Sequence, residues 1–80
     1  MNRLPSKAVV ESIRLRFPAG TRVELVRMND PYSKLKPGDR GTVDFCDDCG
    51  TLFCVWDQGS SLGVVYGEDE VIKIEDNDDD

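Results

Sequence analysis

Short segments that alternate apolar and polar residues, separated by turns containing glycine, fill most of this sequence after residue 20. In the segment 51–57, Leu52, Cys54 and Trp56 share one face, and Trp56 is predicted to be the main core residue. The other strands are expected at 21–28, 42–45, 61–66 and 71–74. Several short strands joined by such turns are typical of a small β-barrel.

An amphipathic helix is predicted ahead of the strands, over residues 6–17. Ser6 is a suitable N-cap, apolar residues recur at spacings of three and four, and Pro18 and Gly20 follow the end. The apolar stripe must be buried, so we expect the helix to close one side or end of the barrel. The predicted organisation is a flexible N-terminus over 1–5, the helix over 6–17, the barrel over 18–75 and a disordered acidic tail over 76–80.

Two features of the composition restrict the class of protein. The chain has 80 residues and no histidine. Histidine is the commonest general base, so no Ser-His-Asp or Cys-His pair is available and a protein without enzymatic activity is predicted. No apolar run approaches the ~20 residues of a membrane helix, and the N-terminus has no apolar signal core. We therefore expect a soluble cytoplasmic protein that does not bind membranes.

Charge is distributed unevenly along the chain. Residues 1–40 hold nine basic and four acidic residues, whereas residues 41–80 hold one basic and twelve acidic residues. Because phosphates would be repelled by the second half, direct nucleic-acid binding is disfavoured and a positive protein surface is the expected partner. The candidate partner-binding residues lie at a hairpin tip and before the last strand: Asp47, Asp48, Glu68, Asp69 and Glu70. The alternative is that these carboxylates only keep the protein in solution.

The three cysteines are candidate zinc ligands. Cys46 and Cys49 are separated by two residues and followed by glycine, as in a zinc knuckle, and Cys54 lies five residues further on. A structural site needs a fourth ligand, for which the candidates are a neighbouring molecule or one of Asp44, Asp48 and Asp57. Two alternatives stay open: the thiols fill the core as small apolar groups, or Cys46 and Cys49 form a disulfide.

Three stretches within residues 18–74 carry a family resemblance: PAGTRVELVRMNDPY, LKPGDRGTV and WDQGSSLGVVYGEDEV. They resemble a family of small domains of unknown function, encoded mainly by bacteriophages, plasmids and conjugative elements of Gram-positive bacteria. The resemblance implies a mainly β fold, a small five-stranded SH3-like antiparallel barrel with one N-terminal α-helix. It implies no enzyme, no cofactor and no catalytic residues.

The small size, the acidity and the cysteine cluster are also similar to those of zinc-containing anti-CRISPR proteins of type II-A. That similarity implies a non-enzymatic inhibitor from a mobile genetic element. It would bind an RNA-guided nuclease in the bacterial cytoplasm and block the loading of target DNA. The alternative expectation is an accessory β-barrel of a phage or plasmid that binds another protein or nucleic acid.

Overall fold

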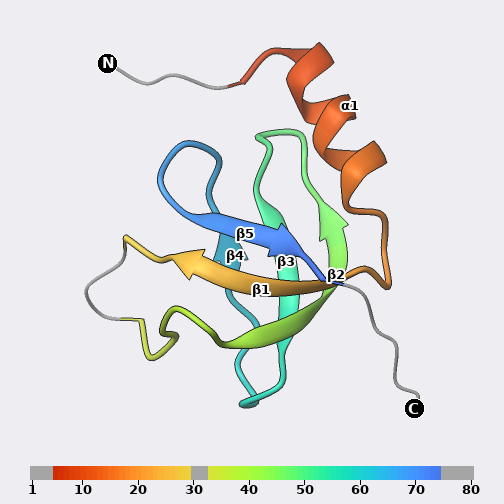
Figure 1. Ribbon diagram of the computed structural model, residues 1–80. Coiled ribbons are helices and arrows are strands. Elements are labelled where there is room, and N and C mark those ends of the chain that lie inside the picture. Colours follow the sequence, from red (N-terminus) through yellow and green to blue (C-terminus); the bar gives the residue numbers. More distant parts are fainter. Residues whose placement is uncertain (1–4, 30–32, 75–80) are drawn as a thin grey trace.

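The computed structural model describes residues 5–29 and 33–74, so the predicted tail over 76–80 and most of the predicted N-terminus over 1–5 lie outside the described residues. One helix is followed by five strands (Figure 1). In chain order they are α1 (Lys7–Arg16), β1 (Arg22–Arg27), β2 (Arg40–Cys46), β3 (Leu52–Trp56), β4 (Gly63–Val64) and β5 (Glu70–Lys73). No helix in this part of the chain is long and apolar enough to cross a membrane.

Helix α1 begins and ends at the residues that the sequence indicates. The Ser6 side chain accepts a hydrogen bond from the Val9 backbone N–H, which satisfies one of the free donors of the first turn. At the other end the Phe17 N–H donates to the Ile13 carbonyl, and Pro18 cannot continue the helix. Val10 and Phe17 are buried against the sheet, so the apolar stripe is covered as expected.

The five strands form one antiparallel sheet in the order β4-β3-β2-β1-β5. A mainly β fold with one N-terminal helix and five antiparallel strands is therefore confirmed. The sheet is not closed into a barrel, because β4 and β5 are its two edges and do not pair with each other over the described residues. The reason lies in β4, which has two residues where the sequence predicted a strand over 61–66.

The side chain of Asp69 ends β4 early. Its carboxylate accepts the Val65 backbone N–H at 2.9 Å, and the Val65 carbonyl accepts the N–H groups of Glu68 and Asp69. These bonds turn the chain back on itself directly after Val64 and use the backbone groups that a longer strand would pair. An open edge remains where a closed barrel would continue.

The core lies on the concave side of the sheet and is built around Trp56. This residue is 1% exposed, and its indole N–H donates to the Leu62 carbonyl at 3.1 Å. Leu52 and Cys54 are buried on the same face, which confirms the alternation predicted for this strand. Gly41 on β2 passes so close to Trp56 that a Cβ there would stand 2.9 Å from the indole ring.

Candidate functional site

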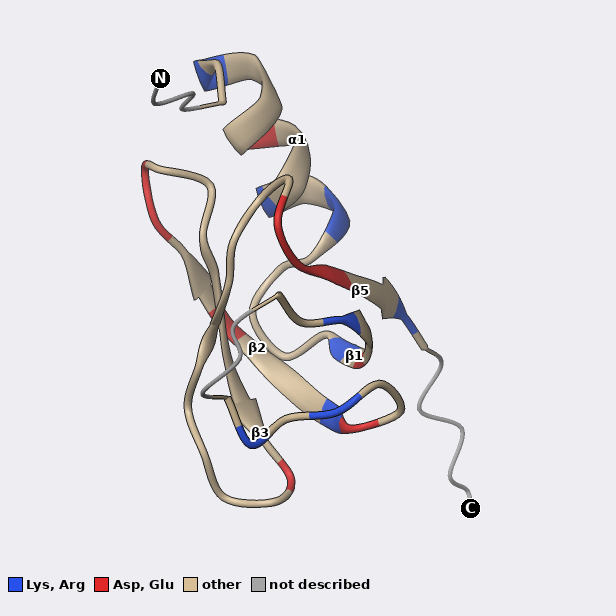
Figure 2. Ribbon diagram, turned by 90° about the vertical axis from the view of Figure 1, so that its left-hand side faces the viewer, with Lys and Arg blue, Asp and Glu red and all other residues tan. Residues whose placement is uncertain are grey.

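Four of the five predicted acidic residues lie in two turns at the end of the sheet that α1 covers, and the fifth, Glu70, begins β5 (Figures 1 and 2). Asp47 and Asp48 belong to the turn between β2 and β3, and Glu68 and Asp69 to the turn between β4 and β5. The two turns lie side by side, because a Cβ on Gly50 would come within 3.7 Å of the Tyr66 side chain. Residues far apart in the sequence thus reach one end of the molecule.

The first turn gives its two aspartates different roles. One carboxylate oxygen of Asp47 accepts the backbone N–H groups of both Cys49 and Thr51, each at 2.9 Å. These two bonds fix the turn and leave Asp47 half-buried. Asp48 points outward, with a side chain 99% exposed. Of this pair, Asp48 is the aspartate whose carboxylate is exposed to solvent.

The second turn shows the same division. Asp69 accepts the backbone N–H of Asn29 with one oxygen and that of Val65 with the other, at 2.8 and 2.9 Å. Glu68 is exposed and accepts the side-chain amide of Asn29. Glu70 is exposed at the first position of β5. We name Asp48, Glu68 and Glu70 the acidic end, because these three residues are exposed to solvent.

An open groove of about 360 Å³ lies beside the acidic end. Its apolar lining comes from α1 and from the buried face of the sheet and includes Ile13, Phe17, Leu52, Val64 and Val71. Charged side chains of both signs also line it, namely Arg16, Arg27, Asp69 and Glu70. A groove of this size and composition accommodates an apolar side chain of a partner, with charged groups around it.

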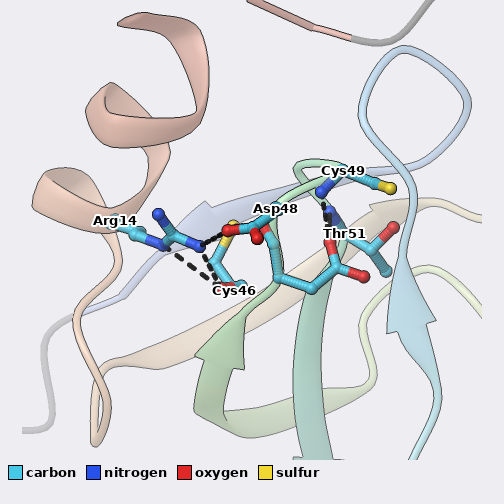
Figure 3. A network of polar contacts seen from close by, with 6 residues as sticks. Arg14, Cys46, Asp48, Cys49 and Thr51 are labelled. Atoms are coloured by element: carbon cyan, nitrogen blue, oxygen red, sulfur yellow. Dashed lines mark hydrogen bonds and ion pairs between the residues drawn. The ribbon is translucent and has the colours of Figure 1, made fainter. Parts of the chain in front are cut away.

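Arg14 connects the helix to the first acidic turn, a role that the sequence did not indicate. Its guanidinium donates to the Cys46 carbonyl at 3.0 Å and to the Asp48 carboxylate at 2.9 Å (Figure 3). The hydrogen bond to Asp48 raises the pKa of the Arg14 guanidinium. No local sequence pattern pairs two residues 34 positions apart, so only the fold reveals this contact.

The three cysteines do not converge. Cys46 and Cys54 are buried, whereas Cys49 is exposed and its side chain points away from Cys46 (Figure 3). Burial raises the pKa of the Cys54 thiol to about 12. All three cysteines are free, and in the described part of the chain no three Cys, Asp or Glu side chains are grouped to hold a metal ion.

This arrangement therefore does not fit a zinc knuckle built from Cys46, Cys49 and Cys54. It resembles the alternative in which Cys46 and Cys54 fill the core. Zinc binding remains a prediction that elemental analysis tests: about one zinc ion per chain in protein purified without added metal would support it, and trace zinc would exclude it.

The fold brings basic residues of the first half of the sequence into ion pairs with acidic residues of the second half. Arg14 pairs with Asp48, and Arg22 pairs with Asp57 through two hydrogen bonds of 2.6 and 2.8 Å. The Arg22 guanidinium lowers the pKa of the Asp57 carboxyl. Ribbon segments of both charge types occur in several parts of the fold (Figure 2). Over residues 5–29 and 33–74, acidic residues of the second half are therefore partly paired with basic residues of the first half.

One helix packed on an open five-stranded antiparallel sheet defines a small mainly β domain. Within this class, the chain belongs to a family of domains of unknown function (DUF4314), whose model matches residues 6–74. The match begins at the N-cap of α1 and ends one residue after β5, so it includes the helix, the sheet and both acidic turns. Comparison with curated proteins gave no match.

Proposed function

We propose that this protein is a non-enzymatic interaction protein whose acidic end binds a basic surface of another protein. The observation that carries the proposal is the position of Asp48, Glu68 and Glu70 beside an open groove lined by both apolar and charged residues. The exposed carboxylates would pair with lysines or arginines of the partner, while the groove receives an apolar side chain. Complementary charge then increases the association rate and selects the partner, and the groove adds apolar burial.

The specific partner that we propose is a type II-A CRISPR RNA-guided nuclease, which would make this protein an anti-CRISPR inhibitor. Nucleases of this kind hold the guide–target duplex in a positively charged channel. Carboxylates on a rigid domain would occupy part of that channel in place of DNA phosphates. Target DNA would then fail to load while the guide RNA stays bound. The protein would act in the cytoplasm of the bacterial host, without contacting nucleic acid or membrane itself.

The composition and the fold support this proposal. The chain has a net charge of −6, and the fold leaves three of its carboxylates exposed at one end. The family match assigns no activity, so the mobile-element origin rests on the sequence resemblance. The alternative is an accessory domain of a phage or plasmid that binds another protein or nucleic acid, and the experiment below distinguishes the two.

The test is cleavage of target DNA by a guide-loaded type II-A nuclease, with the protein added before or after the DNA. Inhibition only when the protein is added first would support blocked loading. The variant D48K/E68K/E70K should abolish inhibition and remain folded, because none of these side chains is buried. Asp47 and Asp69 are left unchanged, since they hold the two turns.

A matched pair of variants controls for net charge. E70K and E24K each exchange one strand glutamate for lysine, on β5 and on β1. E70K should weaken inhibition, whereas E24K should retain it, because Glu24 does not belong to the acidic end and its carboxylate accepts a hydrogen bond from Arg40. Equal effects of the two would contradict the proposed site, and no inhibition at high excess would favour the accessory-domain alternative.

A further inference from the structure

A β-bulge breaks the alternation of strand β2 on the face of the sheet that is turned away from the core. Val43 pairs with Cys54 and Phe45 pairs with Phe53, so Asp44 is an extra residue. Val43 and Cys46 are both buried, and the two residues between them are both exposed. A bulge of this kind redirects side chains. Here it places a carboxylate next to an aromatic ring on the outer face.

The aromatic ring belongs to an exposed apolar surface. Phe45 stacks on Phe53 with 4.8 Å between ring centroids and 20° between the planes, yet Phe45 remains 52% exposed. Val55 extends the surface along β3 and is 54% exposed. Gly63 on the neighbouring strand leaves room for the Phe53 ring, since a Cβ there would stand 3.1 Å from it. We name Asp44, Phe45, Phe53 and Val55 the Phe45 face.

A hollow of about 260 Å³ adjoins the Phe45 face. Asp44 and Phe45 line it together with Arg14 and the Pro18-Ala19 segment. Arg14 already donates to Asp48 and to the Cys46 carbonyl. Asp44 forms no hydrogen bond or ion pair with any residue in 5–29 or 33–74. The uncompensated charge of the hollow is therefore negative.

We propose that the Phe45 face binds an arginine-bearing segment of a protein partner. A guanidinium stacks favourably on an aromatic ring and forms charge-assisted hydrogen bonds with a carboxylate, and here Phe45 and Asp44 offer both groups at one place. The Pro18-Ala19 side of the hollow would receive the methylene stem of the same side chain.

An exposed aromatic face could also bind single-stranded nucleic acid or a second copy of the chain. The negative charge of Asp44 favours an arginine-bearing partner over both. Single-stranded nucleic acid also stacks on aromatic rings, but its phosphates would meet Asp44 on a chain of net charge −6. A second copy of the chain would bring two such charges together at an apolar contact. An arginine of a basic partner instead neutralises Asp44.

This inference rests on the proposed function in one respect, the basic character of the partner. It uses different residues and a different surface. The Phe45 face and the acidic end would be two contact sites on one domain, and each can fail without the other.

The experiment is an NMR titration of the full chain with a peptide of alternating arginine and glycine. Control peptides carry citrulline, the neutral analogue of arginine, in every arginine position. We expect backbone amide shifts at residues 44–46 and 53–55 with the arginine peptide only. D44N and F45L should each weaken the affinity about threefold or more. D57N, which removes a carboxylate from the far end of β3, is the matched control and should retain it.

Three results would overturn the inference: equal shifts with the citrulline peptide, an equal loss with D57N, or stronger binding of a single-stranded oligonucleotide at the same amides. A concentration-dependent dimer in sedimentation that F45L dissolves would also overturn it. The variant D48K/E68K/E70K separates the two sites. If the wild type does not inhibit the nuclease, the proposed function is refuted. If the variant still shows the peptide shifts, this inference stands independently of that result.

Discussion

Replacing Asp47 with alanine removes the acceptor of two backbone N–H groups, those of Cys49 and Thr51, both bonded at 2.9 Å. Each bond is charge-assisted, and the residue is half-buried, so we take about 1 kcal/mol for each bond, below the range for fully buried charged groups. The total loss of about 2 kcal/mol is a large part of the roughly 4–12 kcal/mol expected for 80 residues. The melting temperature should fall by roughly 8–16 °C.

The neighbouring substitution, Asp48 to alanine, should leave stability almost unchanged. Asp48 is 99% exposed and its ion pair with Arg14 is fully hydrated, while Arg14 keeps its bond to the Cys46 carbonyl. Urea denaturation followed by the fluorescence of Trp56, the one tryptophan of the chain, measures both variants. D47N keeps a neutral acceptor and should fall between D47A and the wild type. The same midpoint for D47A and D48A would refute the division between an aspartate that holds the turn and one that does not.

Three further predictions concern the core. G41A should lose about 1–3 kcal/mol in the same urea assay, because its Cβ would stand 2.9 Å from the Trp56 ring, and an unchanged midpoint would contradict that packing. A thiol reagent at pH 8 should modify exposed Cys49 rapidly and Cys54 only after unfolding; equal rates would contradict the burial of Cys54. Burial raises the pKa of Cys54 from its ordinary 9.0 to about 12, so the unfolded chain loses this proton first. Stability should therefore fall as pH rises from 9 to 12, and less steeply in C54V; identical slopes would refute the shift.

The helix and the strand faces were predictable because their signals are local. Ser6 and Pro18 mark the two ends of a helical pattern of apolar residues. The alternation of Leu52, Cys54 and Trp56 lies within one segment and requires no knowledge of distant residues. The same alternation places half-buried Phe53 and exposed Val55 on the opposite face.

The closure of the sheet was not predictable in the same way. Whether the chain continues β4 or turns depends on one hydrogen bond, from the Val65 N–H to Asp69, between residues that a strand pattern also accommodates. The β-bulge at Asp44 was not predictable either. Asp44 has no partner residue on β3, and this follows from the register in which β2 pairs with β3. Register depends on contacts across strands, and a local pattern does not contain them.

The sequence predicted which acidic residues form the candidate site. It did not predict which of them hold the turns and which are exposed. Asp47 and Asp48 are chemically identical neighbours, and only the direction of each side chain makes one a turn acceptor and the other an exposed partner of Arg14. Glu68 and Asp69 differ in the same way. The groove beside them is lined by residues from several distant segments, including α1, so no single segment of the sequence predicts it.

The central claim is that the acidic end and target DNA compete for one basic surface of a guide-loaded nuclease. The most direct measurement is the affinity of this protein for the guide-loaded type II-A nuclease, determined by calorimetry with and without bound target DNA. The account predicts tight binding to the DNA-free complex, a large loss of affinity once DNA is bound, and a comparable loss in D48K/E68K/E70K. Equal affinity for both forms of the nuclease, or for the wild type and that variant, would contradict it.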